Sequence, residues 1–144
     1  MKLFLDTNIL IDFILERPQF YPTAAMIVSY AVERKIEIAV SALSVVTANF
    51  ICVVRSKMSD DIYRRKIDFL RDFMTICSVN DWDVYHSYDT KWKDFEDGVQ
   101  YASAKRWNPD FLVTRNVKDF EEHDIAVVTS EEMCEILMKE CAAE

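Results

Sequence analysis

The chain has 144 residues, of which 51% are hydrophobic, and it carries a formal net charge of −8. This length is enough for one well-buried domain over residues 1–144 and too short for two ordinary ones. No apolar run reaches the length of a membrane span, because charged residues interrupt the first hydrophobic stretch. The beginning of the chain also lacks the pattern of a signal peptide.

The composition excludes several types of site. The chain has a single glycine, Gly98, whereas a P-loop or a GxGxxG dinucleotide loop needs several. The four cysteines have no CxxC spacing, and neither histidine is placed to complete a zinc site with them. Scattered cysteines without a secretion signal indicate reduced thiols, so we expect a cytoplasmic protein.

The negative charge is concentrated in the last part of the chain. Residues 121–144 contain eight acidic residues and one lysine, so the first 120 residues hold 16 basic and 17 acidic residues. A solvated helix face explains such an acidic end. The charge therefore does not exclude a polyanionic substrate, although no strongly basic patch favours one.

The first predicted element is a strand over residues 3–5, an apolar run that suits burial on both faces of a sheet. The segment Asp6-Thr7-Asn8 offers helix N-caps, and apolar residues then recur at helical spacing. A second helix is predicted from Pro22, and a β-branched run over 36–40 predicts the second strand. Ser41 is expected to cap a third helix that extends to about residue 56.

Further helices and strands are predicted along the rest of the chain. Helices are expected over residues 60–74, 82–92 and 94–104 and from Ser130 onward. The remaining strands are expected over residues 76–79, 111–114 and 125–128. Short strands that alternate with helices predict an α/β fold with a mostly parallel sheet covered on both faces.

Polar residues follow the ends of two predicted strands. Asp6 follows the first strand, and the segment Thr114-Arg115-Asn116 follows the fourth in the same way. Ligands bind beyond the carboxyl ends of parallel strands, so Asp6 and Asn116 share one edge if these strands are neighbours. Asp119 comes three residues later. A simple capping role explains Asp6 about equally well.

Two more carboxylates stand at the start of a predicted helix. Asp94 and Asp97 are three residues apart and lie on one face of that helix end, although a cap followed by a first-turn acid explains them too. Carboxylates without histidine favour hard cations such as Mg²⁺ or Mn²⁺. Such a site cleaves phosphodiesters by activating a bound water and neutralising charge on the phosphate.

The sequence resembles PIN-domain proteins, which include the toxin ribonucleases of bacterial toxin–antitoxin pairs. Four segments that span nearly the whole chain carry the resemblance, namely Phe4–Asp12, Asp94–Ala102, Leu112–Phe120 and Val128–Glu132. The resemblance implies a three-layer α/β/α fold with a central five-stranded parallel sheet. It also implies an Mg²⁺- or Mn²⁺-dependent ribonuclease that prefers single-stranded RNA, with a small antitoxin protein as a partner and no membrane association. A homodimer is compatible with the sequence.

The resemblance matches Asp6 and Asp97 to acids of the family site, and Asp94 and Asp119 are nearby carboxylates that aid them. Metal ligands are therefore expected at Asp6, Asp94, Asp97 and Asp119. Catalysis is expected to depend on Asp6, Asp97, Asp119 and Asn116, with support from Asn8, Asn49 and Thr114. PIN-domain proteins usually have a glutamate in the third helix, and the nearest residue here is Asn49. Many also have an aspartate where this chain has Asn116, so a weakened metal site is expected.

Basic residues suggest where a substrate binds. Arg64 and Arg65 lie in a locally basic stretch, and we expect them to contact RNA phosphate or the acidic surface of a partner. Arg115 and Lys118 are further candidates for substrate binding. A solvated amphipathic helix face explains Arg64 and Arg65 at least as well.

Two alternatives to an active nuclease remain. One is a catalytically weakened PIN domain that binds RNA or a protein, and the other is a phosphohydrolase. An aspartate-nucleophile phosphohydrolase would need a second aspartate two residues after Asp6, and that position is Asn8.

Overall fold

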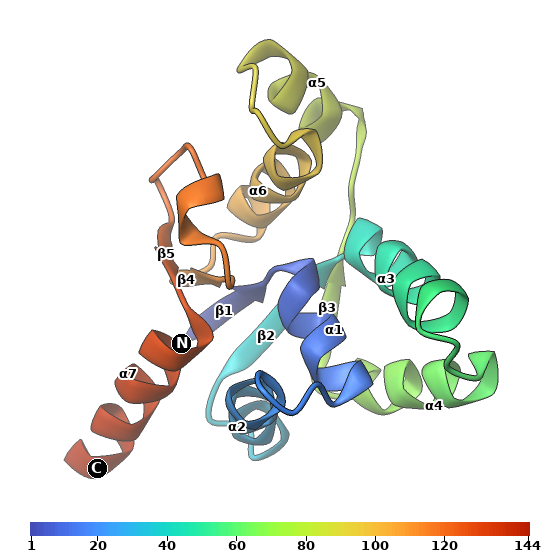
Figure 1. Ribbon diagram of the computed structural model, residues 1–144. Helices are drawn as coiled ribbons and strands as arrows, with labels where there is room; N and C mark the ends of the chain where they lie inside the picture. Colours follow the sequence, from blue (N-terminus) through green and yellow to red (C-terminus); the bar gives the residue numbers. More distant parts are fainter.

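The computed structural model describes residues 1–144 and has a five-stranded sheet at its centre (Figure 1). The strands are β1 (Lys2–Leu5), β2 (Glu37–Ser41), β3 (Met74–Cys77), β4 (Phe111–Val113) and β5 (Ala126–Val128). Their order is β3-β2-β1-β4-β5, and all neighbouring pairs are parallel. The predicted parallel α/β sheet, with β1 beside β4, is confirmed.

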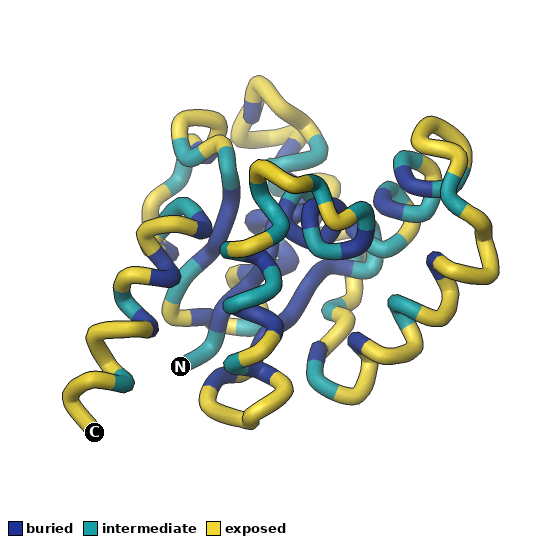
Figure 2. The backbone as a smooth tube through the Cα atoms, turned by 60° about the horizontal axis from the view of Figure 1, so that its bottom comes forward, coloured by how far each residue is buried: buried dark blue, intermediate teal, exposed yellow.

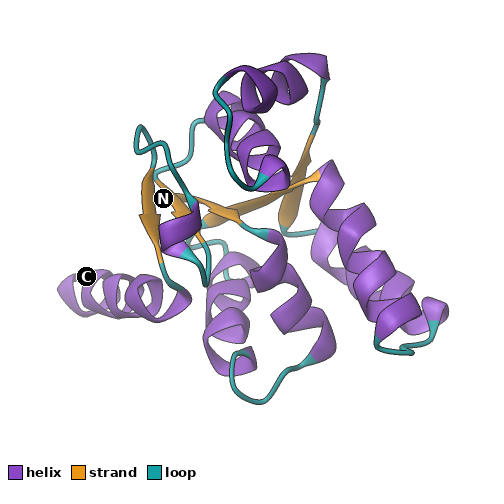
Figure 3. Cartoon of the chain, turned by 45° about the horizontal axis from the view of Figure 1, so that its top comes forward, coloured by secondary structure: helices purple, strands orange, loops and turns teal.

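Seven α-helices surround the sheet (Figure 3). They are α1 (Thr7–Leu15), α2 (Tyr21–Val32), α3 (Ala42–Asn49), α4 (Asp60–Arg71), α5 (Asp81–Asp89), α6 (Phe95–Trp107) and α7 (Ser130–Ala143). A π-helical segment, η1 (Phe50–Arg55), continues α3, and a 3-10 turn, η2 (Val117–Asp119), follows β4. None of the helices combines the length and apolarity needed to cross a bilayer.

The sheet separates two hydrophobic cores. Successive residues of a strand point to opposite faces, so Leu3 and Leu5 join the larger core with residues of α1 to α4 and α7. Phe4 points the other way and packs with Tyr101 of α6 and Trp92. Figure 2 shows the buried residues concentrated on the strands and on the helix surfaces that face them. The result is the expected three-layer arrangement, with α5 and α6 forming one outer layer.

Several predicted boundaries shift in the structure. The third strand begins at Met74 rather than at residue 76, because the buried Met74 pairs with Ile38 of β2. The strand ends at Cys77, since the backbone carbonyl of Ser78 accepts hydrogen bonds from Ser103 and Arg106 of α6 instead of a strand. Because β3 begins at Met74, the helix that was predicted over residues 60–74 ends earlier, at Arg71.

Helices α5 and α6 form a closely packed hairpin (Figure 1). The single glycine, Gly98, lies in α6 at this contact, where an added Cβ would collide with the side chain of Ser87 in α5 and would be 2.8 Å from Cγ of Trp92. The indole nitrogen of Trp92 donates a hydrogen bond of 2.9 Å to the carboxylate of Glu122. The loop between α5 and α6 is thereby attached to the segment that follows η2.

Candidate functional site

Asp6 stands at the junction of β1 and α1, where it is the N-cap of the helix. Its Oδ1 accepts a hydrogen bond of 2.7 Å from the backbone N–H of Thr7. Its Oδ2 accepts bonds from the hydroxyl of Thr114 (2.8 Å) and the side-chain amide of Asn8 (3.2 Å). The predicted capping role and the predicted contact with the end of β4 therefore occur together.

The side chain of Asn8 also helps to fix the loop after β4. Its Oδ1 accepts a hydrogen bond of 3.3 Å from the backbone N–H of Arg115. The hydroxyl of Thr114 accepts one of 3.1 Å from the N–H of Asn116. Asn8 and Thr114 thus connect Asp6 to the loop after β4 through their hydrogen bonds.

The start of α6 supplies carboxylates from the other side of the site. Asp94 is the N-cap and accepts a hydrogen bond of 3.0 Å from the N–H of Asp97, which lies in the first turn. Glu96 lies between them and accepts a bond of 3.3 Å from the side-chain amide of Gln100. Glu96 was not among the predicted residues, although its spacing of four from Gln100 places both on one helix face.

These groups line one open pocket of about 280 Å³ at the carboxyl edge of the sheet. Five of its lining residues are acidic, namely Asp6, Asp94, Glu96, Asp97 and Asp119. The other polar or basic lining residues are Thr7, Asn8, Arg17, Thr47, Gln100, Arg115 and Asn116. The expected convergence of Asp6, Asp94, Asp97, Asn116 and Asp119 is therefore present.

The negative charges of the pocket carboxylates raise the pKa values of their neighbours. Burial, followed by the negative charges of Asp6, Asp94, Asp119 and Glu96, raises the pKa of Asp97 to about 8. Burial also raises the pKa of Asp6, which is only 5% exposed. No salt bridge neutralises Asp97, so the pocket lacks a positive charge at this carboxylate.

The two arginines of the pocket wall are engaged by a different acid. Asp12 of α1 is 1% exposed and lies between Arg17 and Arg115, at 3.5 Å and 3.0 Å from their nitrogens. The guanidinium of Arg115 also lies over the ring of Phe20, 4.2 Å from its centroid. No role was expected for Asp12, whose carboxylate lies between both cations.

The expectation for Asn49 is wrong in the structure. Its side-chain amide faces Asp60 of α4, 3.4 Å away, and lines a separate groove between α3 and α4. The residue of α3 that lines the acidic pocket is Thr47, two positions earlier. A spacing of two moves a side chain by about 200° around a helix, to nearly the opposite face. The neutral residue that α3 contributes to the acidic pocket is therefore Thr47.

A buried hydrogen-bond network supports the floor of the pocket. The Thr7 hydroxyl bonds to Ser44 Oγ (2.7 Å) and accepts from the Gln100 amide (2.8 Å). Ser44 in turn donates to Gln100 Oε1 at 2.9 Å. This network joins α1, α3 and α6. Ser44 and Thr47 are three residues apart on α3, and this spacing is the sequence signal that identifies the pocket-facing side of the helix.

The predicted substrate-binding residues Arg64, Arg65 and Lys118 do not line the acidic pocket, and only the two arginines form salt bridges. Arg64 and Arg65 are paired with Asp60 and Asp61 one helical turn earlier, at 2.6 Å and 2.7 Å. They lie on the groove between α3 and α4 and not on the acidic pocket. Lys118 lies in η2 beside Asp119, is exposed and forms no salt bridge.

The residues of the pocket fit a hard divalent cation that retains part of its water shell. All the acidic donors are oxygens, and Asp97 has no cationic partner, as expected of an Mg²⁺ or Mn²⁺ site. No three acidic, histidine or cysteine side chains form a ready-made ligand set for one ion. One or two carboxylates with several waters suffice for Mg²⁺, so this arrangement is compatible with its binding.

Comparisons with known proteins relate the whole chain to one family. A family model described as PIN domain matches residues 2–118. Ribonuclease VapC1 of Aquifex aeolicus (strain VF5) is 27% identical over 139 residues, which cover 93% of this chain and 94% of that relative.

The fold also occurs in solved structures. A chain of a toxin–antitoxin complex from Klebsiella pneumoniae is 23% identical, with a TM-score of 0.64 and coverage of 89% of this chain and 97% of that one. A chain of VapBC2 from Rickettsia felis, bound to a DNA fragment from its promoter, is 20% identical, with a TM-score of 0.61 and coverage of 90% and 98%.

The raised pKa of Asp97 predicts a pH-dependent stability of the ion-free protein. The ordinary pKa of this carboxyl is 3.8, and in the folded state it is about 8, so between these values the folded state binds more protons than the unfolded chain. The free energy of unfolding should therefore fall as the pH rises from about 4 to about 8 and level off above that. In EDTA, Asp97→Asn should be more stable than wild type at pH 8, by a margin that shrinks at pH 5.

Thermal unfolding of both proteins at the two pH values tests this expectation. Asp89→Asn is a suitable control, because Asp89 is exposed on α5 and forms no hydrogen bond or salt bridge. A pH-independent difference between Asp97→Asn and wild type would contradict the electrostatic explanation.

Proposed function

Because this chain belongs to the PIN-domain family, we propose that it is an endoribonuclease that uses Mg²⁺ or Mn²⁺ to cleave single-stranded RNA. The observation that carries this proposal is the convergence of five carboxylates on one open pocket at the carboxyl edge of the sheet. The named ribonuclease with 27% identity supports the choice of RNA as the substrate.

Asp6 and Asp97 would hold the ion, and Asp94, Glu96 and Asp119 would add negative charge around it. A bound ion lowers the pKa of a water molecule and neutralises charge on the phosphate. The chain itself keeps Asp6 oriented through Thr7, Thr114 and Asn8. Asn116 lies at the pocket with its side-chain amide available to contact substrate.

Single-stranded RNA suits this pocket for a geometric reason. The reacting phosphate has to enter a space lined by side chains of α1, α3, α6 and the loop after β4. A flexible single strand can bend its backbone into such a space, whereas a stiff duplex holds its phosphates on a regular helix.

We also propose that the protein is the toxin of a toxin–antitoxin pair, a role supported by the complexes that share its fold. The groove between α3 and α4 has a volume of about 570 Å³ and suits a partner segment. Its apolar lining includes Val45, Val46 and Ile67, and its basic lining includes Arg64 and Arg65. An amphipathic helix with acidic residues beside its apolar face would complement this surface.

A second candidate function is an RNA- or protein-binding domain with little catalytic power. The neutral side chains at Thr47 and Asn116 and the absence of a ready-made ligand set favour it. The cleavage experiment below separates the two functions.

Cleavage of single-stranded RNA by purified protein should require added Mn²⁺ or Mg²⁺. Asp6→Asn and Asp97→Asn should each lower the rate by orders of magnitude, because they keep the size of the side chain and remove the charge that attracts the ion. Initial rates with each ion and with EDTA provide the measurement, with Asp72→Asn as control, because Asp72 is exposed before β3 at the amino end of the sheet. Equal rates in all proteins would point to a contaminant and favour the binding domain.

A glutamate at position 47 should strengthen the metal site. Thr47→Glu places a carboxylate in the acidic pocket, so it should tighten Mn²⁺ binding in calorimetry and raise the cleavage rate. Without the ion the same variant should be less stable than wild type, because like charges at close range repel. Asn49→Glu is the matched control and should change neither metal affinity nor rate. The reverse pattern would contradict our placement of α3.

The partner groove is tested with the product of the neighbouring reading frame. We expect that protein to co-elute with this chain in gel filtration, and Arg64→Glu with Arg65→Glu should weaken the complex at low salt at least about tenfold. The control is Lys139→Glu on α7, an exposed charge away from the groove. Co-elution that is insensitive to the arginine changes would place the partner elsewhere.

A further inference from the structure

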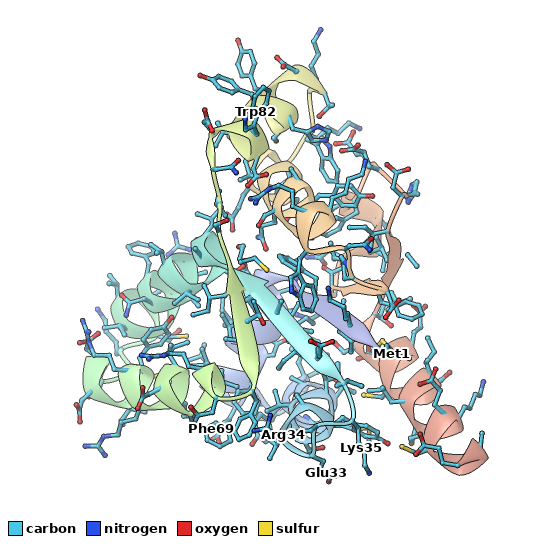
Figure 4. All side chains as sticks on the ribbon, turned by 180° about the vertical axis from the view of Figure 1, so that it is seen from behind. Met1, Glu33, Arg34, Lys35, Phe69 and Trp82 are labelled. Carbon is cyan, nitrogen blue, oxygen red and sulfur yellow. The ribbon has the colours of Figure 1, made fainter.

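Helix α5 exposes three aromatic side chains to solvent. Trp82, Tyr85 and Tyr88 are 74%, 59% and 72% exposed and follow one another at a spacing of three along the helix. Trp82 projects from α5 at the far end of the molecule from α7 (Figure 4). None of the three is among the aromatic pairs of the fold, whereas the neighbouring Trp92 packs against Tyr101 and Phe120.

The α5–α6 hairpin brings one end of this aromatic row close to the start of α6. Asp83, in the first turn of α5, is 3.1 Å from Nε of Arg106 near the end of α6, so the two helices are antiparallel. The end of α5, where Tyr88 lies, is therefore beside the start of α6. Asp94, Glu96 and Asp97 line the pocket from that start.

Unpaired cations stand between the aromatic row and the pocket. Lys91 and Lys93 lie in the loop that joins α5 to α6, and both are exposed without a salt bridge. The backbone N–H of Lys93 donates a hydrogen bond of 2.8 Å to Glu121, which attaches this loop to the segment after η2. Lys118 of η2 is likewise exposed and unpaired.

We propose that the aromatic face of α5, together with Lys91, Lys93 and Lys118, binds single-stranded RNA and delivers it to the acidic pocket. Bases would stack on Trp82, Tyr85 and Tyr88, and the lysines would contact phosphates near the carboxylates. This inference rests on the proposed ribonuclease function and names the surface that holds the strand outside the pocket.

Charge favours RNA over a second copy of the chain as the occupant of this surface. Three unpaired lysines complement a polyanion. A two-fold contact through the same face would bring the lysines of both copies close together. Arg17 and Arg115, the two arginines that line the pocket, share the buried carboxylate of Asp12, so the lysine group is the positive charge near the pocket that has no acidic partner.

The experiment measures binding of a short fluorescein-labelled oligouridine by anisotropy in EDTA, where no cleavage occurs. The variant with Trp82→Ala, Tyr85→Ala and Tyr88→Ala should bind at least about tenfold more weakly than wild type. Phe69→Ala is the matched control, because Phe69 is a half-exposed aromatic residue on α4. Lys91→Ala with Lys93→Ala should reduce the dependence of binding on salt.

Two further readouts separate stacking from a structural role. Oligouridine should quench the fluorescence of exposed Trp82, and Trp82→Phe should abolish this quenching while retaining most of the affinity. Thermal unfolding should show that the triple variant remains folded, since its replaced side chains are exposed.

Each outcome has a distinct meaning. Wild-type affinity in the triple variant, together with metal-dependent cleavage by wild type, would overturn this inference and leave the proposed function intact. A wild-type protein that neither binds nor cleaves the oligonucleotide would overturn both. A shift from dimer to monomer in the triple variant by sedimentation would assign the aromatic face to a second copy and overturn the inference as well.

Discussion

The organisation of the site depends on the burial of the Asp6 carboxylate at the point where β1 becomes α1. Its three hydrogen-bond donors come from the helix start and from the end of β4, so one side chain holds two neighbouring strand ends together. Burial of a carboxylate without such hydrogen-bond donors would lower the free energy of unfolding. The same bonds that make the burial tolerable fix the direction of the carboxylate, and the remaining acids gather around it from α6 and η2.

Much of this arrangement could be predicted from local patterns. Apolar runs of strand length followed by capping residues predicted the parallel sheet, and the matching polar segments after β1 and β4 predicted that Asp6 and Asn116 share an edge. The position on α3 could not be predicted in this way. Helix faces change within two residues, so choosing Asn49 instead of Thr47 moved the expected neutral residue to the groove on the other side.

Charge composition was a poorer guide than pattern, because pairing decides which charges remain available. Arg64 and Arg65 stand out in the sequence, yet each is matched by an aspartate one turn earlier. Arg17 and Arg115 come from distant segments and meet at Asp12, a contact that only the folded chain creates. The less conspicuous Lys91, Lys93 and Lys118 are the ones left without partners near the pocket.

The mutual repulsion of the pocket carboxylates has a consequence for ligand competition. With a pKa of about 8, Asp97 is predominantly protonated at neutral pH in the ion-free protein. A metal ligand must be deprotonated, so an entering cation has to displace that proton. The hydrogen ion is thus a rival ligand for the same oxygen atoms, and occupancy by any cation falls as the solution becomes more acidic. The acidity of the surroundings would thereby set how much free ion the proposed metal site needs.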